Sequence, residues 1–173
     1  KILKKRCKSK LALDATASIG LEEDHEYSDV SAFSSCKGLF GLTGASFVVF
    51  NSKAQNEILQ FNLDIQTHLQ KKMTGPYHAI CSLNDVLKNY DHFKYSVLVN
   101  KKYCLKKMKD KLKYEIENQP NLCTLIDATI KKKNRKVILY QSRGDISGSI
   151  ICHLGEVHLK KKSKGKIFDS IFY

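Results

Sequence analysis

The residues of this chain whose types and spacing could support chemistry are its cysteines, its histidines and its dense runs of lysine. The six cysteines are widely separated and include no Cys-x-x-Cys pair. Cys81, Cys104, Cys123 and Cys152 each lie among apolar residues. This setting predicts buried, reduced thiols and a reducing compartment rather than a disulfide framework.

Two segments combine residue types that bind metals. His78-x-x-Cys81 and Cys152-His153 could in principle meet as a composite zinc site. Nothing in their spacing requires this, so the sequence predicts no metal and no other cofactor. A Cys–His nucleophile pair stays open as an alternative, although no local signature supports one.

Lysine dominates the charge of the chain. The 173 residues include 30 Lys plus Arg against 17 Asp plus Glu, which gives a net charge of +13 with histidine neutral. The whole excess lies after residue 70, because the first 70 residues carry equal numbers of acidic and basic side chains. Arg6, Arg135 and Arg143 are the only arginines, and arginine is the residue that reads guanine edges bidentately. The charge therefore favours attraction to polyanions. Salt weakens this attraction, and the base sequence of a nucleic acid does not direct it.

Three basic runs concentrate this charge, at residues 1–10, 131–136 and 160–166. Each run is typical of a nuclear import signal or a polyanion contact, and a solvated, solubilising face is the alternative interpretation. Three such runs in one chain predict a nuclear protein. The predicted nucleic-acid-binding residues are the basic ones of the last two runs: Lys131, Lys132, Lys133, Arg135, Lys136, Lys160, Lys161, Lys162, Lys164 and Lys166.

Acidic residues are scarce where a nuclease would need them. Metal-dependent nucleases hold Mg²⁺ with several carboxylates that converge at strand ends. Only nine acids follow residue 70, and no predicted strand except the one before Asp145 ends in an acid. No G-x-S-x-G sequence supports a serine hydrolase. The sequence therefore predicts no catalytic residue and no enzymatic activity.

The elements that must position these residues are short. The chain begins at Lys1 and is expected to be a fragment of a longer protein. Residues 1–30 are predicted to be loosely structured, and residues 31–173 to form a single α/β domain. In the first half, Phe47-Val-Val-Phe50 predicts a buried strand, and residues 57–66 predict a second strand paired with it.

The second half alternates helical and extended patterns. Ser82 and Asp85 resemble a capping box at the start of a helix. Residues 146–154 fit either a short helix or a strand. The other predicted elements are helices at 82–90, 101–118 and 122–130, with Met108 filling a gap in the core, and strands at 95–99, 137–140 and 156–159. The predicted fold class is α/β: a helix-flanked, largely parallel sheet in the C-terminal half, with an N-terminal β-rich extension.

The stretch from Ser82 to about Lys162 resembles the transgene activation suppressor (TASOR) family. The similar segments share the spacing of their apolar residues and a few polar residues. They are 82–88, 93–99, 104–112, 136–141, 145–150 and 157–161. The resemblance implies a degenerate PIN-like domain, which is a nuclease-type α/β sandwich without its acidic centre. It also implies a nuclear scaffold in chromatin silencing of transposons or transgenes.

These observations lead to two hypotheses of function. The first is a non-catalytic scaffold, a pseudoenzyme-like interaction domain with protein partners in a nuclear complex. The alternative is an RNA- or DNA-binding domain that contacts phosphates through its lysine-rich runs without reading sequence. Polybasic runs also attract anionic lipid, but no stretch has the length of about 20 apolar residues that spans a membrane.

Overall fold

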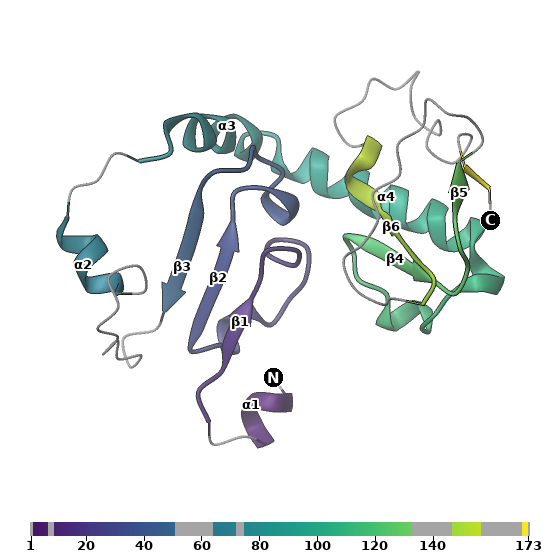
Figure 1. The fold of residues 1–173 in the computed structure, drawn as a ribbon, viewed down its shortest axis with the longest axis horizontal. Helices are drawn as coiled ribbons and strands as arrows, with labels where there is room; N and C mark the ends of the chain where they lie inside the picture. Colours follow the sequence, from purple (N-terminus) through teal and green to yellow (C-terminus); the bar gives the residue numbers. More distant parts are fainter. Residues whose placement is uncertain are drawn as a thin grey trace. The chain divides into compact units, whose positions relative to one another are not determined.

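The structure is a computed structural model that describes residues 2–6, 9–50, 64–71, 75–132, 147–156 and 171–172. The chain divides into two compact units, Lys1–Lys88 and Asn89–Tyr173, and each is considered by itself (Figure 1). Both units combine helices with small sheets, so the α/β class is confirmed at this level. The expected boundary at residue 30 and the single domain over 31–173 stay predictions.

The first unit is built on a three-stranded sheet. Its strands are β1 (Ala12–Asp14), β2 (Val30–Ser34) and β3 (Ser46–Phe50) in that spatial order, with β1 parallel and β3 antiparallel to β2. The rings of Phe33 and Phe47 face each other across β2 and β3, with centroids 5.4 Å apart. The strand predicted at 47–50 is confirmed. Its predicted burial is wrong, because β3 lies at an edge of this sheet and Val49 is 56% exposed.

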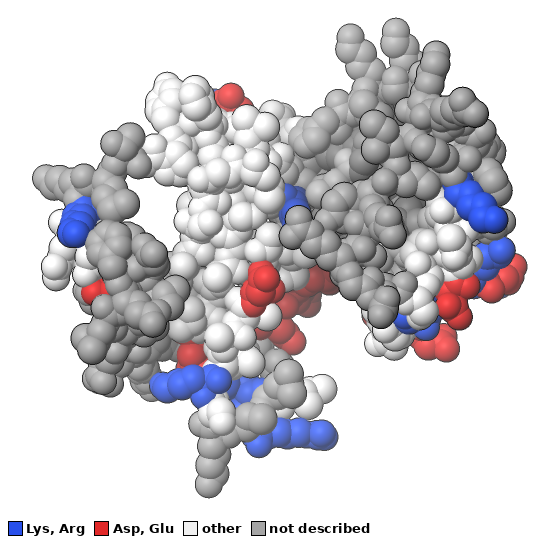
Figure 2. Space-filling view, viewed as in Figure 1, with Lys and Arg blue, Asp and Glu red and all other residues white. Residues whose placement is uncertain are grey.

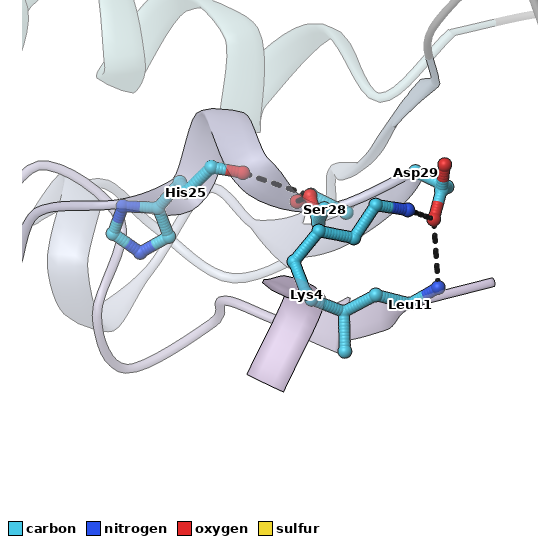
Figure 3. Close-up of polar contacts among 6 residues, drawn as sticks. Lys4, Leu11, His25, Ser28 and Asp29 are labelled. Atoms are coloured by element: carbon cyan, nitrogen blue, oxygen red, sulfur yellow. Dashed lines mark hydrogen bonds and ion pairs between the residues drawn. The ribbon is translucent and has the colours of Figure 1, made fainter. Parts of the chain in front are cut away.

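An ion pair ties the N-terminal helix α1 (Ile2–Arg6) to the sheet. The Lys4 ammonium and the Leu11 backbone N–H both donate to Asp29 Oδ2, the latter at 2.8 Å (Figure 3). Asp29 is buried immediately before β2, and Leu11 immediately precedes β1. The hydrogen bonds from Lys4 and Leu11 lower the pKa of this carboxyl to about 2.

Serine side chains organise the loop between β1 and β2. The Ser28 hydroxyl donates to the backbone carbonyl of His25 at 2.8 Å (Figure 3), and Ser18 Oγ lies 2.9 Å from His25 Nε2. Such local bonds satisfy backbone groups that lie outside the strand ladder. Buried Ala15 and Leu21 show that this loop packs into the unit.

Two further helices of this unit depart from the sequence predictions. Residues 57–63 of the predicted second strand lie outside the described residues, and the following α2 (Ile65–Gln70) is helical. Helix α3 (Tyr77–Leu87) begins earlier than expected, which puts Ser82 inside it. The predicted capping box is therefore wrong, and the Ser82 hydroxyl instead accepts a hydrogen bond of 3.0 Å from the Leu42 backbone N–H.

The second unit packs one long helix against short strands (Figure 1). The helix is α4 (Tyr90–Lys107), which contacts both a strand and a 3-10 turn that follow it. The remaining elements are η3 (Lys109–Lys111), η4 (Ile116–Asn118), β4 (Cys123–Ile126), β5 (Lys131–Lys132), β6 (Ser149–Cys152), η5 (His153–Glu156) and β7 (Ile171–Phe172). Buried Cys104, Met108, Ile126 and Ile151 form its core, which confirms the core position predicted for Met108.

Several element types predicted for this unit are wrong. Residues 95–99, predicted as a strand, lie inside α4. The helix continues without interruption through this segment, although it contains two β-branched valines. Residues 123–126, predicted as helical, form β4, in which Thr124 and Ile126 face inward at the period of a strand. The predicted strand at 137–140 and residues 157–159 of the strand predicted at 156–159 lie outside the described residues, and Glu156 lies in η5.

The strand pairing of this unit is antiparallel where it is described. Strand β4 pairs with β6, and β5 pairs with β7, both in antiparallel register. The expectation of a largely parallel sheet is therefore wrong for these four strands. The expectation of a parallel sheet assumes a helix before each strand. In the structure, β4 follows 3-10 turns, and among the described residues no helix directly precedes its partner β6.

A glycine at the start of β6 is required by close backbone approach. Gly148 has φ of +90°, and a Cβ built there would lie 2.0 Å from the Ile126 carbonyl oxygen. We expect Gly148→Ala to lower the free energy of unfolding by about 3 kcal/mol, through strain and displacement of β4. Urea denaturation monitored by circular dichroism measures this change.

Gly75→Ala is the matched control, because a Cβ at Gly75 meets no atom within 4 Å. This control should leave the urea midpoint nearly unchanged. Equal stability of the two variants would show that the approach of Gly148 to Ile126 is not a constraint on the fold.

The paired Asp29 carboxylate predicts a pH dependence for the first unit. Its pKa of about 2 lies below the value of about 3.9 expected in the unfolded chain. Its contribution to stability is therefore present above about pH 4 and is lost as the pH falls towards 2. We expect Asp29→Asn to be less stable than the wild type at pH 6, with a difference that shrinks by pH 2.

Thermal unfolding at several pH values tests this expectation. Asp85→Asn is the control, because Asp85 is exposed and its ion pair with Lys88 spans 3.4 Å on the surface. A difference for Asp29→Asn that stays constant from pH 6 to pH 2 would contradict the role given to the ion pair.

Candidate functional site

The predicted lysine sites are only partly described by the structure. Lys131 is exposed at the start of β5, and Lys132 follows it in the same strand. The other predicted residues lie outside the described part of the chain: Lys133, Arg135, Lys136, Lys160, Lys161, Lys162, Lys164 and Lys166. Lys131 and Lys132 pair with Phe172 and Ile171 of β7 in antiparallel register.

Helix α4 carries a surface that the sequence analysis missed. Tyr95, Val99, Lys102, Tyr103 and Lys106 recur at the spacing of one helical face, and all five are exposed. Tyr95 is 67% exposed and Tyr103 is 43% exposed. We call these five residues the outer face of α4. Aromatic rings and ammonium groups thus alternate along about two to three turns of helix.

The cations of this face, Lys102 and Lys106, are exposed to solvent. Lys107 lies beside it with its ammonium 5.7 Å from the centroid of the Tyr103 ring, in a cation–π arrangement. Lys102 and Lys106 take no part in the ion pairs Lys4–Asp29 and Lys88–Asp85, which lie in the first unit. Figure 2 shows one face of the molecule, on which basic and acidic side chains of the second unit lie close together.

A chain of buried hydrogen bonds holds the inner side of α4. His153 Nδ1 lies 2.7 Å from the Asn121 carbonyl oxygen, and His153 Nε2 lies 2.8 Å from Thr124 Oγ1. A carbonyl only accepts, so Nδ1 carries the proton, and the Thr124 hydroxyl donates to Nε2. The neighbouring Thr124 side chain also acts on the pKa of the buried Cys104 thiol of α4. The chain Asn121–His153–Thr124 therefore joins β4 to η5.

Burial sets the protonation states of this chain. His153 is buried, and this burial lowers its pKa; the neighbouring Lys101 charge acts in the same direction, and the bond to Asn121 opposes it. Burial also raises the pKa of the Cys104 thiol, although the neighbouring Thr124 side chain acts the other way. A neutral imidazole and a protonated thiol without solvent contact form a structural connection rather than an exposed nucleophile.

Three further hydrogen bonds fix α4 through its own polar side chains. Asn100 Nδ2 donates to the His153 backbone carbonyl at 2.8 Å. The Lys101 ammonium donates to the Gln119 carbonyl at 2.6 Å and to Asn121 Oδ1 at 2.8 Å. Lys101 is therefore committed to the fold, and the lysines of the outer face differ from it in this respect.

The metal and thiol hypotheses can be compared with these positions. Both ring nitrogens of His153 are engaged in hydrogen bonds, which removes it from the composite zinc site. Across the described ranges, no group of three or more His, Cys, Asp or Glu side chains could hold a metal ion. The expectation of buried thiols holds for Cys104 and is wrong for Cys81 and Cys152, which are exposed because they lie on outward sides of α3 and β6.

Comparison with known proteins gives a likeness of fold. The structure is similar to an alanine–glyoxylate aminotransferase from Nostoc sp., with a TM-score of 0.60 and 18% sequence identity. The likeness covers 74% of this chain and 41% of that chain, so this chain spans less than half the length of the aminotransferase. No protein-family model and no curated protein sequence matches this chain. In the described part, no helix is long and apolar enough to cross a membrane.

The resemblance to the TASOR family is wrong. The fold that the chain shares with a solved structure is that of part of an aminotransferase, and nothing supports a PIN-like domain. The resemblance depends on the spacing of apolar residues, and buried elements of unrelated folds share such spacing. One of its segments, 93–99, includes a predicted strand, but it is helical in the structure.

The prediction that the chain is not an enzyme is overturned by the same finding, because the protein with the similar fold is an enzyme. That prediction compared the acids with those of a nuclease-type parallel sheet. The described strands of the second unit pair in antiparallel fashion, so the comparison does not apply.

The signal for the outer face was present in the sequence. Its residues repeat every three or four positions from Tyr95 to Lys106, which is a helical period. The apolar run Tyr95-Ser-Val-Leu-Val99 by itself predicts a strand, and a strand at 95–99 would not continue the helical pattern into the lysines.

The buried chain predicts a specific loss of stability. Thr124→Val keeps the shape of the side chain and removes the hydroxyl, which leaves His153 Nε2 buried without its donor. We expect a decrease in the free energy of unfolding of about 1–3 kcal/mol. Urea denaturation at pH 7.5 measures it.

Thr124→Ser is the control, since it keeps the hydroxyl and should retain more of the stability than valine does. Equal stability of the valine and serine variants would contradict this role for Thr124.

The lowered pKa of His153 adds a dependence of stability on pH. Wild-type stability should be highest above about pH 6.5 and decrease as the pH falls below it, because the unfolded chain then binds the proton more strongly.

Proposed function

We propose that the second unit binds single-stranded nucleic acid without reading its base sequence, through the outer face of α4. The observation that carries the proposal is the alternation of exposed Tyr95 and Tyr103 with Lys102 and Lys106 on one face of a helix. Single strands are bound by cationic surfaces that follow the backbone and by aromatic rings on which bases stack. The outer face of α4 offers both groups.

The type of cation supports binding to phosphate rather than to base edges. Lysine is a compact point charge that neutralises phosphates, and arginine is rare in this chain. The charge excess after residue 70 lies mostly in the same unit as α4. Lys131, exposed in β5, adds a cation from the predicted basic runs. The resulting affinity should be strongly dependent on salt.

The exposed rings support a preference for single strands. Tyr95 and Tyr103 are eight residues apart, about 12 Å along the helix axis. Each ring contributes a stacking surface, and stacking requires bases that are not already paired in a duplex. Lys107 over the Tyr103 ring keeps a positive charge next to that stacking surface.

Localisation in the nucleus and protein partners in a nuclear complex remain proposals that accompany this function. The basic runs support a nuclear location. A scaffold role in chromatin silencing was implied only by the TASOR resemblance, and it is not pursued once that resemblance is removed.

The lysines of the outer face should determine the salt dependence of binding. Lys102→Glu with Lys106→Glu should weaken binding of a labelled single-stranded oligonucleotide at least about tenfold at low salt. Loss of two phosphate contacts should make the slope of log K against log salt shallower by about 1.4. Fluorescence anisotropy over a salt series measures both quantities.

The charge-matched control is Lys5→Glu with Lys10→Glu, which changes the net charge equally on exposed residues of the first unit. It should change affinity much less. A similar loss in both double variants would contradict the assignment to α4, and no binding by the wild type at low salt would contradict the proposed function.

The tyrosines separate stacking from charge in the same assay. Tyr95→Ala with Tyr103→Ala should weaken binding to the single strand about tenfold or more and leave binding to inorganic polyphosphate unchanged. Tyr77→Ala is the control, because Tyr77 is 73% exposed and lies in the first unit. Equal loss for the oligonucleotide and for polyphosphate would show that the rings do not stack on bases.

A further inference from the structure

Two cysteines lie directly opposite each other in the antiparallel pair of β4 and β6. The register pairs Cys123 with Cys152, although they are far apart in the sequence. Neither cysteine belongs to the buried chain or to the outer face of α4. Neither cysteine forms a disulfide in the structure.

The hydrogen-bond pattern tells which type of cross-strand pair this is. The His153 backbone N–H donates to the Leu122 carbonyl at 2.8 Å, so Leu122 and His153 are a hydrogen-bonded pair. Pairs alternate along an antiparallel ladder, which makes Cys123 and Cys152, the next pair, a non-hydrogen-bonded one. In such pairs the Cα atoms are about 4.5 Å apart and the side chains approach each other most closely. This separation lies within the range that a disulfide spans.

Both thiols also lie on the side of the pair that solvent reaches. Thr124 and Ile151, the next residues inward along each strand, are buried, and side chains alternate between the two faces of a strand. Cys152 is accordingly exposed and Cys123 is partly exposed. An oxidant can therefore reach the pair without unfolding of the unit.

We propose that Cys123 and Cys152 are a thiol pair that closes reversibly to an intramolecular disulfide. A low-molecular-weight disulfide such as oxidised glutathione is the oxidant. The thiolate of one cysteine attacks the glutathione disulfide and releases one glutathione thiolate, which leaves a mixed disulfide. The second cysteine thiolate then attacks the protein sulfur of this mixed disulfide and releases the second glutathione. Two protein thiols are oxidised to one disulfide, one glutathione disulfide is reduced to two thiols, and the protons end on glutathione.

The remaining described cysteines contrast with this pair. Cys104 is fully buried, and burial raises its pKa, so it is shielded from the same reaction. Cys81 is exposed on α3, and Cys36 Sγ lies 3.0 Å from the Ser34 hydroxyl. Within each unit as it is described, neither has a cysteine opposite it in a strand pair.

Closure of the disulfide would clamp the strands that support α4. Cys152 immediately precedes His153, and Cys123 immediately precedes Thr124, the two residues whose side chains bond each other behind the helix. A covalent link between their neighbours holds this register even when the hydrogen bonds open. Oxidation should therefore protect the second unit against denaturant, and reduction should remove this protection.

The test is incubation of the full chain in glutathione buffers of increasing oxidised fraction, followed by alkylation and digestion without reduction. Mass spectrometry should find the peptide that contains Cys123 linked to the peptide that contains Cys152. The oxidised chain should run as a monomer on a non-reducing gel, and its urea midpoint should shift upward and return on reduction. Cys81→Ser should behave as the wild type does, whereas Cys123→Ser and Cys152→Ser should each lose the link and the shift.

The link between Cys123 and Cys152 must form in the folded protein for the proposal to stand. A dominant link from either cysteine to a different cysteine, stable mixed glutathione adducts without closure, or disulfide-linked dimers would each overturn it. Persistence of the urea shift in Cys152→Ser would also overturn it. The readout does not involve nucleic acid, so its outcome is independent of the proposed function.

Discussion

The second unit depends on one buried hydrogen bond, from the Thr124 hydroxyl to Nε2 of His153. Both residues are shielded from water, so either partner alone would leave a polar group without a hydrogen bond, at a cost larger than the bond itself contributes. The Asn121 carbonyl extends the bond into a chain, and Asn100 of α4 bonds the backbone carbonyl of His153. Helix α4, strand β4 and the turn after β6 consequently have one mutual arrangement in which all these groups are satisfied.

This arrangement gives the two sides of α4 different tasks. Cys104 and Met108 face the core, and Asn100 bonds the backbone of His153. The opposite side presents exposed tyrosines and lysines, in contrast to Lys101, whose ammonium is bonded to residues before β4. A rigidly supported helix can present such a face with little loss of entropy on binding, which favours affinity from a small number of contacts. The thiol pair on the outer side of β4 and β6 lies next to the same support.

Sequence patterns anticipated some elements and failed at others for identifiable reasons. The strand over 47–50 and the core position of Met108 follow from local features, namely a short β-branched aromatic run and a helical apolar stripe. Residues 95–99 have the composition of a strand, and yet they lie within an 18-residue helix, because packing of α4 on the core outweighs local propensity. The opposite error at 123–126 arose because four apolar or small residues fit either period. The predicted basic runs were visible at once, whereas the outer face of α4 became visible only when the helix was known.

The sequence by itself determined the charge of the chain, its location after residue 70, the preference for lysine over arginine and the mixed α/β character. These are sums and local periodicities, which do not depend on how distant segments meet. Only the tertiary structure decided that Thr124 lies beside His153 and that Cys123 lies opposite Cys152. Each of these pairings depends on the register between β4 and β6, and a shift of one residue would exchange the inner and outer faces of both strands. Register between strands far apart in the chain is set by long-range packing, and no local pattern encodes it.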